Sequence, residues 1–317
     1  MSTLGQVMYR SVARTKALKS VLLLPFYVLR FLYFSVKNGS LWFYRYPPGH
    51  YGSPLPGGRE IRRHRAAWFS PAPPPFDGVK LNPEKQLALL DAFAAYHDDF
   101  APNADVAAGS LYHYRNAMFG FADGLILYAF LRHFKPARVI EVGSGFSSGL
   151  MLDTARALTP APHFTFIDPY STDIIDVLKS RPAGSYDLVR KPVQEVDLSL
   201  YAELAENDIL FIDSSHVVKI GSDLSTILYS ILPSLKAGVI VHFHDIYYPF
   251  EYHEAMLMEG RAWNEIYLVR AFLQFNSSFE ILFFNSFVER MHGDRLAQKL
   301  PNYSRSTGNS LWLRKTA

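Results

Sequence analysis

The chain reads RVIEVGSGFSSG at residues 138–149, and this stretch decides the fold. A short β-branched run at 138–142 is followed by the two glycines Gly143 and Gly145, and then by a helical pattern over 148–158. A strand that passes through a glycine turn into a helix is typical of α/β sheets that bind a ligand at the turn. Because glycine allows a tight turn and a close approach of a ligand to the backbone, this turn is the first candidate binding site.

The alternation of strand and helix continues along the chain. Strands are predicted at 164–168, 208–213, 238–245, 279–284 and 310–314, and helices at 83–96, 123–134, 221–232 and 263–275. Continuous apolar strands that alternate with helices predict a doubly wound, mostly parallel sheet with helices on both faces. Ligands of such sheets bind beyond the carboxyl ends of the strands. Four of the predicted strands end in an acid, and these acids are Glu141, Asp168, Asp213 and Asp245.

The glycine turn lacks the features of a phosphate loop. No Lys-Ser/Thr pair ends it, and Ser148 stands where the dinucleotide fingerprint has its third glycine. Glu141, directly before the turn, would repel a pyrophosphate and attract a cation. S-adenosylmethionine has no phosphate and carries an ammonium and a sulfonium group. Asp168, at the end of the next strand, stands where an acid accepts hydrogen bonds from ribose hydroxyls.

Residues 111–314, about two-thirds of the chain, resemble the class I S-adenosylmethionine-dependent methyltransferases. The motifs follow in that family's order, from the bacterial subgroup motif Glu-Val-Gly-Ser-Gly-Phe-Ser-Ser at 141–148 through 167–169 and 211–216 to 236–238 and 244–245. The resemblance implies a Rossmann-like sheet of seven strands that closes with an antiparallel hairpin. It also implies a set of cofactor-binding residues, with the glycines around the methionine part, Asp168 at the ribose, Gln194 near the adenine and Asp213 beside the cofactor. The predicted set is Glu141, Gly143, Ser144, Gly145, Ser147, Asp168, Gln194 and Asp213.

Two neighbouring strand ends carry both acids and histidines, in the runs Asp213-Ser214-Ser215-His216 and His242-Phe243-His244-Asp245. One interpretation is a divalent metal, Mg²⁺ or Mn²⁺, held by Asp213, Asp245 and His244, which would polarise a substrate hydroxyl. The other is metal-free catalysis, in which His216 or His244 is the general base and Asp213 or Asp245 orients it. The aromatic run 247–252 either lines an acceptor pocket or packs on the core.

The N-terminal part differs in composition from the rest. Residues 1–65 carry eleven Lys and Arg residues against the single acid Glu60, whereas the remainder has a net charge of −7. We therefore predict three parts: a basic, aromatic-rich amphipathic segment at 1–46, a Pro/Gly-rich linker or wrapping arm at 47–80, and the methyltransferase-like domain at 81–317. The apolar run 21–36 is too short for a spanning helix. It either lies on a membrane or packs on its own domain or a second copy of the chain.

These features predict a cytoplasmic enzyme. A peripheral position at the inner face of the membrane is a second expected location. Its expected reaction is methylation of a hydroxyl group on a small molecule or a glycan. Two alternatives stay open: a metal-dependent, hydroxylase-like enzyme of the same fold, and an inactive, membrane-associated partner protein. A nucleic-acid substrate is not expected, because the catalytic body is acidic and lacks an Asn-Pro-Pro-Tyr motif.

Overall fold

The structure is a computed structural model that describes residues 48–70, 78–170 (without Ala108 and Ala117) and 186–317, with seven positions between 25 and 46. The chain divides into two compact units, Met1–His64 and Arg65–Ala317. The predicted segment 21–36 lies mostly outside the described residues, as does most of the predicted domain 1–46. In the described part of the chain, no helix is long and apolar enough to cross a membrane.

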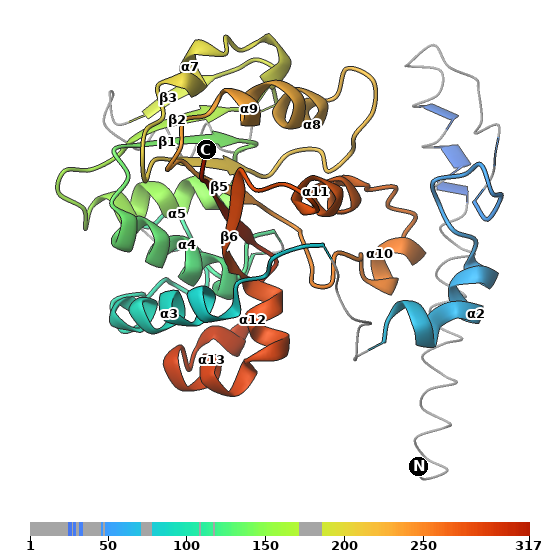
Figure 1. The fold of residues 1–317 in the computed structure, drawn as a ribbon, viewed down its shortest axis with the longest axis horizontal. Helices are drawn as coiled ribbons and strands as arrows, with labels where there is room; N and C mark the ends of the chain where they lie inside the picture. The colour runs from blue at the N-terminus through green and yellow to red at the C-terminus, as the bar shows by residue number, and fades with distance from the viewer. Residues whose placement is uncertain are drawn as a thin grey trace. The chain divides into compact units, whose positions relative to one another are not determined.

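The larger unit is built around one sheet of seven strands (Figure 1). The strands are β1 Arg138–Val142, β2 His163–Ile167, β3 Tyr186–Val189, β4 Ile209–Ile212, β5 Ile240–Phe243, β6 Phe279–Phe284 and β7 Leu311–Lys315. Their order is β3-β2-β1-β4-β5-β7-β6, with parallel pairing from β3 to β5 and antiparallel pairing of β7 with both β5 and β6. The predicted doubly wound, mostly parallel sheet with an antiparallel last strand is confirmed.

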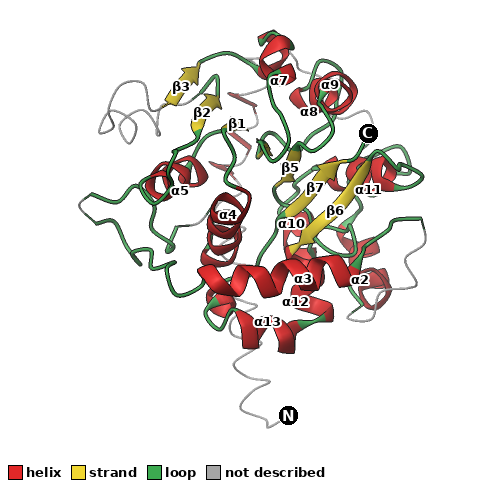
Figure 2. Cartoon of the chain, turned by 60° about the vertical axis from the view of Figure 1, so that its left-hand side comes forward, coloured by secondary structure: helices red, strands yellow, loops and turns green. Residues whose placement is uncertain are grey.

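From β1 onward helical elements lie between most of the strands, whereas α2, α3, η1 and α4 come before β1. They are α2 Gly58–Trp68, α3 Pro83–Phe93, η1 Ala94–Tyr96, α4 Phe121–Phe134, α5 Phe146–Ala155, η2 Val193–Glu195, α7 Ser199–Ala202, α8 Asp223–Thr226, η3 Ile227–Ile231, α9 Leu232–Ser234, α10 Glu254–Met258, α11 Glu265–Leu273, α12 Asn285–Met291, α13 Gly293–Lys299 and η4 Tyr303–Arg305. Helices α3, α4 and α5 lie on one side of the sheet, and α7, α8 and α9 lie on the other (Figures 1 and 2).

Helix α4 is the central helix of its layer. Every residue from Phe121 to Leu131 is buried, and Phe130 stacks on Trp312 of β7 with 3.8 Å between the ring centroids. The helix ends at Lys135, whose φ of 48° is left-handed, directly before Pro136, which cannot continue a helix. Burial of this apolar helix against the sheet fixes the position of its single buried acid, Asp123.

Several helices were not predicted, among them the short helices α7 and α10. Helix α2 lies inside the expected linker 47–80, in a run without proline between Pro56 and Pro71, and the helices α12 and α13 follow β6. The Pro and Gly residues on both sides of α2 suggested an extended chain throughout, but a proline restricts helix only in its own neighbourhood. The expectation of an extended segment is therefore wrong for residues 58–68.

Candidate active site

The strand ends lie level at the carboxyl edge of the sheet. Gly143 N donates to Ile167 O at 2.9 Å, Asp213 N to Val142 O at 2.9 Å, and His244 N to Ile212 O at 3.0 Å. These bonds continue the parallel ladder one residue beyond β1, β4 and β5. The glycine turn, Asp213 and His244 therefore stand side by side at one edge, close to the point where the strand order reverses.

The glycine turn is shaped by its contact with the end of β4. Gly143 has a φ of +84°, and a Cβ built on it would stand 1.8 Å from the carbonyl oxygen of Asp213. Any side chain at this position would clash with the backbone. Gly145 differs, because a Cβ built there meets no atom within 4 Å. The space above Gly145 is open, which fits a ligand that approaches the backbone.

Glu141 lies beneath the turn and supports it. Its carboxylate is fully buried and accepts hydrogen bonds from the hydroxyls of Ser147 and Ser148, both at the start of α5. Burial raises the pKa of Glu141 to about 8, against the opposing effect of the two serines. Glu141 and Ser148 are wholly inaccessible and Ser147 nearly so, which gives all three a supporting position beneath the turn. The predicted direct contacts of Glu141 and Ser147 with the cofactor stay predictions.

Asp168 is joined to the turn at the end of β2. Its Oδ2 accepts hydrogen bonds from Ser144 N at 3.1 Å and from Ser144 Oγ at 2.8 Å, and its Oδ1 accepts one from Tyr170 N at 2.7 Å. The turn and the predicted ribose-binding carboxylate therefore form one hydrogen-bonded unit. Gln194 lies in η2, exposed, and its amide donates to Gly221 O at 2.8 Å. The predicted contacts of Ser144, Asp168 and Gln194 with the cofactor stay predictions.

Two carboxylates and two imidazoles meet beside Asp213. His216 Nε2 lies 3.5 Å from Asp213 Oδ1 and 3.7 Å from Asp245 Oδ2. His244 Nδ1 lies 3.8 Å from Asp213 Oδ1 and 3.6 Å from Asp245 Oδ1. His216 and Asp245 have φ angles of 58° and 55°, so the backbone turns sharply at both and directs the side chains inward. The predicted grouping of these four residues is confirmed by the geometry.

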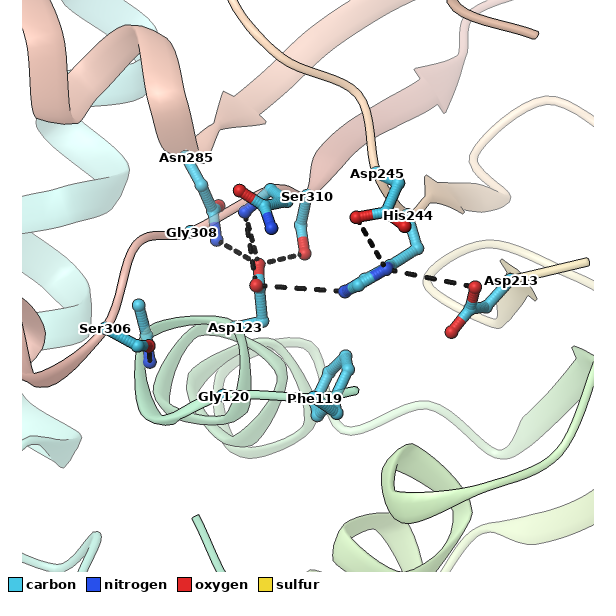
Figure 3. Close-up of polar contacts among 12 residues, drawn as sticks. Phe119, Gly120, Asp123, Asp213, His244, Asp245, Asn285, Ser306, Gly308 and Ser310 are labelled. Atoms are coloured by element: carbon cyan, nitrogen blue, oxygen red, sulfur yellow. Dashed lines mark hydrogen bonds and ion pairs between the residues drawn. The ribbon is translucent and has the colours of Figure 1, made fainter. Parts of the chain in front are cut away.

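Each imidazole is backed by a second, buried carboxylate that the sequence analysis missed. His216 Nδ1 lies 2.8 Å from Glu265 Oε2 at the start of α11. His244 Nε2 lies 3.7 Å from Asp123 Oδ2 on α4, as Figure 3 shows. Asp123 is held by Asn285 Nδ2 at 2.9 Å, Asn309 N at 2.9 Å and Ser310 Oγ at 2.5 Å. The arrangement runs from Asp123 through His244, the Asp213/Asp245 pair and His216 to Glu265, and we call it the carboxylate–imidazole row.

The row changes the expected protonation of its histidines. Burial lowers the pKa of His244, but Asp213, Asp123 and Asp245 outweigh this and raise it to about 10. Burial also lowers the pKa of His216, and Asp213 and Glu265 outweigh it and raise it to about 10. Burial raises the pKa of Asp213, yet His244 and His216 bring it below its usual range. An imidazolium has no free lone pair at neutral pH, so this electrostatic environment disfavours either histidine as general base.

His216 and His244 each lie 3.5–3.8 Å from the carboxylates of Asp213 and Asp245. Over the described ranges, no three His, Asp or Glu side chains are arranged to hold a metal ion. The predicted metal ligands Asp213, Asp245 and His244 are close together, but each lies within reach of an imidazole nitrogen or a carboxylate instead. The metal therefore stays a prediction without support from this geometry.

The aromatic run after Asp245 packs on the core, which decides between its two interpretations. Tyr247, Phe250 and Tyr252 are buried, and Tyr247 donates its hydroxyl to Asp245 Oδ1 at 2.9 Å. Trp263, before α11, lies over His216 with 4.2 Å between the ring centroids. Aromatic side chains thus cover part of the row, next to Asp245 and His216.

Comparisons with known proteins agree with this site. A family model described as a methyltransferase domain matches residues 140–246, which hold the glycine turn, Asp168, Asp213 and Asp245. An uncharacterized protein of Archaeoglobus fulgidus is 34% identical over 170 residues, which are 52% of this chain and 76% of that protein.

Two solved structures are similar to the chain at low identity. The Podospora anserina methyltransferase PaMTH1, bound to S-adenosylhomocysteine, is 17% identical with a TM-score of 0.42, over 84% of this chain and 100% of that one. The plantazolicin methyltransferase BpumL is 13% identical with a TM-score of 0.41, over 75% of this chain and 100% of that one. Neither likeness is high enough to carry a substrate over to this chain. The chain belongs to one family with the archaeal protein, and residues 140–246 within its seven-stranded sheet are a class I S-adenosylmethionine-dependent methyltransferase domain.

Proposed function

We propose that this protein methylates a hydroxyl group of a small molecule or a glycan. One observation carries the proposal: Asp213 belongs both to the glycine turn, through its carbonyl oxygen against Gly143, and to the carboxylate–imidazole row, through its side chain. The backbone of Asp213 therefore contacts the predicted cofactor-binding turn, and its side chain belongs to the row that we propose to accept the proton of the substrate hydroxyl. Methyl transfer is an in-line displacement that depends chiefly on such alignment.

The residues present fit S-adenosylmethionine, which supplies an electrophilic methyl group when bound. The open backbone at Gly145 would hold its methionine part, and the Asp168 carboxylate would accept hydrogen bonds from its ribose. Asp213 and Asp245 are the acceptors for the proton of the substrate hydroxyl. His216 and His244 hold these two like charges together, and Asp123 and Glu265 hold the histidines.

A glycan or small-molecule acceptor is favoured by the limited polar area around Asp213. Asp213 keeps 30% of its side chain exposed, whereas Asp245 keeps 19% and both histidines are buried. Only a small part of the row is therefore accessible, which suits the approach of a single hydroxyl group. The metal-dependent alternative has no such support, because the described residues offer no metal-binding group.

The first experiment is isothermal titration of the full chain with S-adenosylmethionine and S-adenosylhomocysteine. We expect binding that Asp168→Ala abolishes and Asp168→Asn weakens, whereas Asp294→Ala on the exposed surface of α13 leaves it unchanged. Methyl transfer from radiolabelled cofactor to a panel of glycans and small phenols follows, with EDTA present. Asp213→Asn should then remove transfer while cofactor binding persists. Absence of cofactor binding by folded protein would contradict the proposal, and transfer that EDTA abolishes would favour the metal-dependent enzyme.

A further inference from the structure

The segment that precedes α4 is fastened to helix α5, and we call its residues 110–114 the strap. Asp153 of α5 holds the beginning of the strap, because its Oδ2 accepts three hydrogen bonds from successive residues. The donors are Ser110 Oγ at 3.1 Å, Leu111 N at 2.7 Å and Tyr112 N at 3.0 Å. These three bonds fix the place on α5 at which the strap begins.

From Asp153 the strap runs along α5 toward the first residue of that helix. Leu111 lies against Gly149, where an added Cβ would stand 3.2 Å from the Leu111 Cβ. His113 lies against Phe146, with 5.1 Å between the ring centroids in an edge-to-face arrangement. Because Asp153, Gly149 and Phe146 are four and three residues apart, they share one face of the helix. The strap therefore brings His113 to the first turn of α5, beside the glycine turn.

The ring of His113 has an unsatisfied nitrogen at this place. Its Nδ1 is buried and has no hydrogen-bond partner in the part of the chain that the structure describes, whereas the residue as a whole is half-buried. A buried polar nitrogen without a partner is costly, which favours a ligand that supplies one. The space above Gly145, the residue before Phe146, is open. The next ring of the strap, Tyr114, contacts a different helix, because it lies against Phe121 of α4.

The charges around the turn indicate which part of the cofactor His113 meets. The methionine part of S-adenosylmethionine carries an ammonium and a carboxylate. Glu141, Asp168 and Asp213 make the strand side of the turn acidic, so this side attracts the ammonium and repels the carboxylate. The backbone N–H groups and the dipole at the start of α5 favour an anion. An imidazole there adds a donor, since it donates through one nitrogen when neutral and through both when protonated.

We propose that His113 binds the carboxylate of the methionine part of the cofactor as a hydrogen-bond donor. It is then a cofactor-binding residue from outside the glycine turn, and the bonds between Asp153 and the strap hold it in place. The inference rests on the cofactor-binding part of the proposed function and does not depend on the acceptor of the methyl group.

The test is isothermal titration of the full chain with two ligands that differ in one group. One is S-adenosylhomocysteine, and the other is its decarboxylated analogue, which keeps the adenosine, the thioether and the amine. His113→Phe keeps an aromatic ring beside Phe146 and removes the donor. It should bind S-adenosylhomocysteine roughly 10-fold more weakly than the wild type does, because a hydrogen bond to a charged group is lost. Its binding of the decarboxylated analogue should be unchanged.

Two further variants separate the donor from the structure of the strap. His113→Asn keeps an amide donor and should bind S-adenosylhomocysteine within about threefold of the wild type. Tyr114→Phe removes the hydroxyl of the neighbouring strap residue, whose ring lies on α4, and should bind both ligands like the wild type. Circular dichroism and the urea midpoint verify that each variant is folded.

Four results would overturn the inference. The first is unchanged binding of S-adenosylhomocysteine by His113→Phe, and the second is an equal loss of both ligands in that variant. The third is a loss in folded His113→Asn as large as in His113→Phe. The fourth is a folded wild type that binds neither ligand, which would also contradict the proposed function. The first three leave the proposed function standing, because the wild type still binds the cofactor.

Discussion

Gly143 and Asp213 are in direct backbone contact, and the fold of the cofactor turn depends on it. A Cβ on Gly143 would stand 1.8 Å from the carbonyl oxygen of Asp213, whereas a Cβ on Gly145 would meet no atom within 4 Å. Two glycines of one motif therefore have different reasons to be glycine. At Gly143 the backbone leaves no room, and at Gly145 the vacant space is available to a ligand.

We therefore expect Gly143→Ala and Gly145→Ala to fail in different ways. Gly143→Ala must displace the turn or β4, so it should lower the free energy of unfolding by several kcal/mol, roughly the cost of an overpacked site with a strained φ. Gly145→Ala should keep the stability within about 1 kcal/mol of the wild type and weaken S-adenosylhomocysteine binding. Chemical denaturation and isothermal titration measure the two effects. Equal stability losses in both variants would contradict this division of roles.

Glu141 gives the fold a pH dependence whose sign follows from its raised pKa. Its pKa is about 8 in the folded chain and near 4.5 when unfolded. The unfolded state releases this proton first, so the stabilisation is complete below pH 4.5 and is lost as the pH rises to 8. Glu141→Gln does not titrate; its amide oxygen accepts from one serine hydroxyl, and its amide nitrogen donates to the other serine, whose hydroxyl must turn. The free energy of unfolding of the variant minus that of the wild type should rise by about 1.4 kcal/mol per pH unit between pH 5 and 8.

Urea denaturation of both proteins at pH 5, 6, 7 and 8 measures this difference. Glu195→Gln, at an exposed position in η2, is the matched control and should keep the wild-type pH dependence. Parallel stability curves for Glu141→Gln and the wild type would show that the buried carboxyl does not carry the proton.

The sequence predicted the parts of the site that lie within a few residues of a strand end. Gly143, Asp168, Asp213 and Asp245 each follow an apolar run, and parallel pairing then brings strand ends to one edge without further information. Asp123 and Glu265 could not be found in this way. Glu265 stands in the first turn of a helix, where acids are common, and its contact with His216 spans 49 residues.

The sequence around Asp123 does indicate a buried acid. It is the single charged residue among Phe121–Leu131, a run that the structure buries completely. An acid in an otherwise apolar helix requires a buried partner. The partner itself, His244, follows from tertiary packing of α4 against the sheet, which no local pattern specifies.

Glu265 should control the protonation of His216. The pKa of His216 is about 10, because Asp213 and Glu265 outweigh the effect of burial. A raised histidine pKa stabilises the fold fully below pH 6.5, and this stabilisation is lost as the pH rises through 10. Glu265→Gln should bring the His216 pKa down and lower the free energy of unfolding at pH 7 by about 3 kcal/mol, as expected when one partner of a buried pair is removed.

NMR titration of the protein with labelled histidine rings measures this pKa directly. In the wild type the His216 ring should stay protonated through pH 8, and in Glu265→Gln it should titrate at lower pH. Glu259→Gln, at an exposed end of α10, should leave the titration unchanged. A wild-type His216 ring that is neutral at pH 7 would restore this histidine as a candidate general base.

For His242 we expect the opposite pH dependence of stability, because its buried ring forms no hydrogen bond with a described residue. Neither of its ring nitrogens has a partner in the part of the chain that the structure describes, and the ring stacks on Phe211 with 3.7 Å between centroids. Burial lowers the pKa of His242 well below its usual range, and the neighbouring His244 adds to this. Because His242 takes up a proton near pH 6.5 in the unfolded chain and only at lower pH in the folded chain, the free energy of unfolding decreases as the pH falls below 6.5.

We expect His242→Phe to be more stable than the wild type by about 1–3 kcal/mol at pH 8, because two unsatisfied buried nitrogens are removed. The difference should grow by about 1.4 kcal/mol for each pH unit below 6.5, since phenylalanine cannot take up a proton. Thermal and urea denaturation between pH 5 and 8 measure it. A variant that is less stable at every pH would mean that the aromatic core between Phe211 and Trp312 has no room for the larger ring, and a constant difference would mean that His242 is protonated in the folded state.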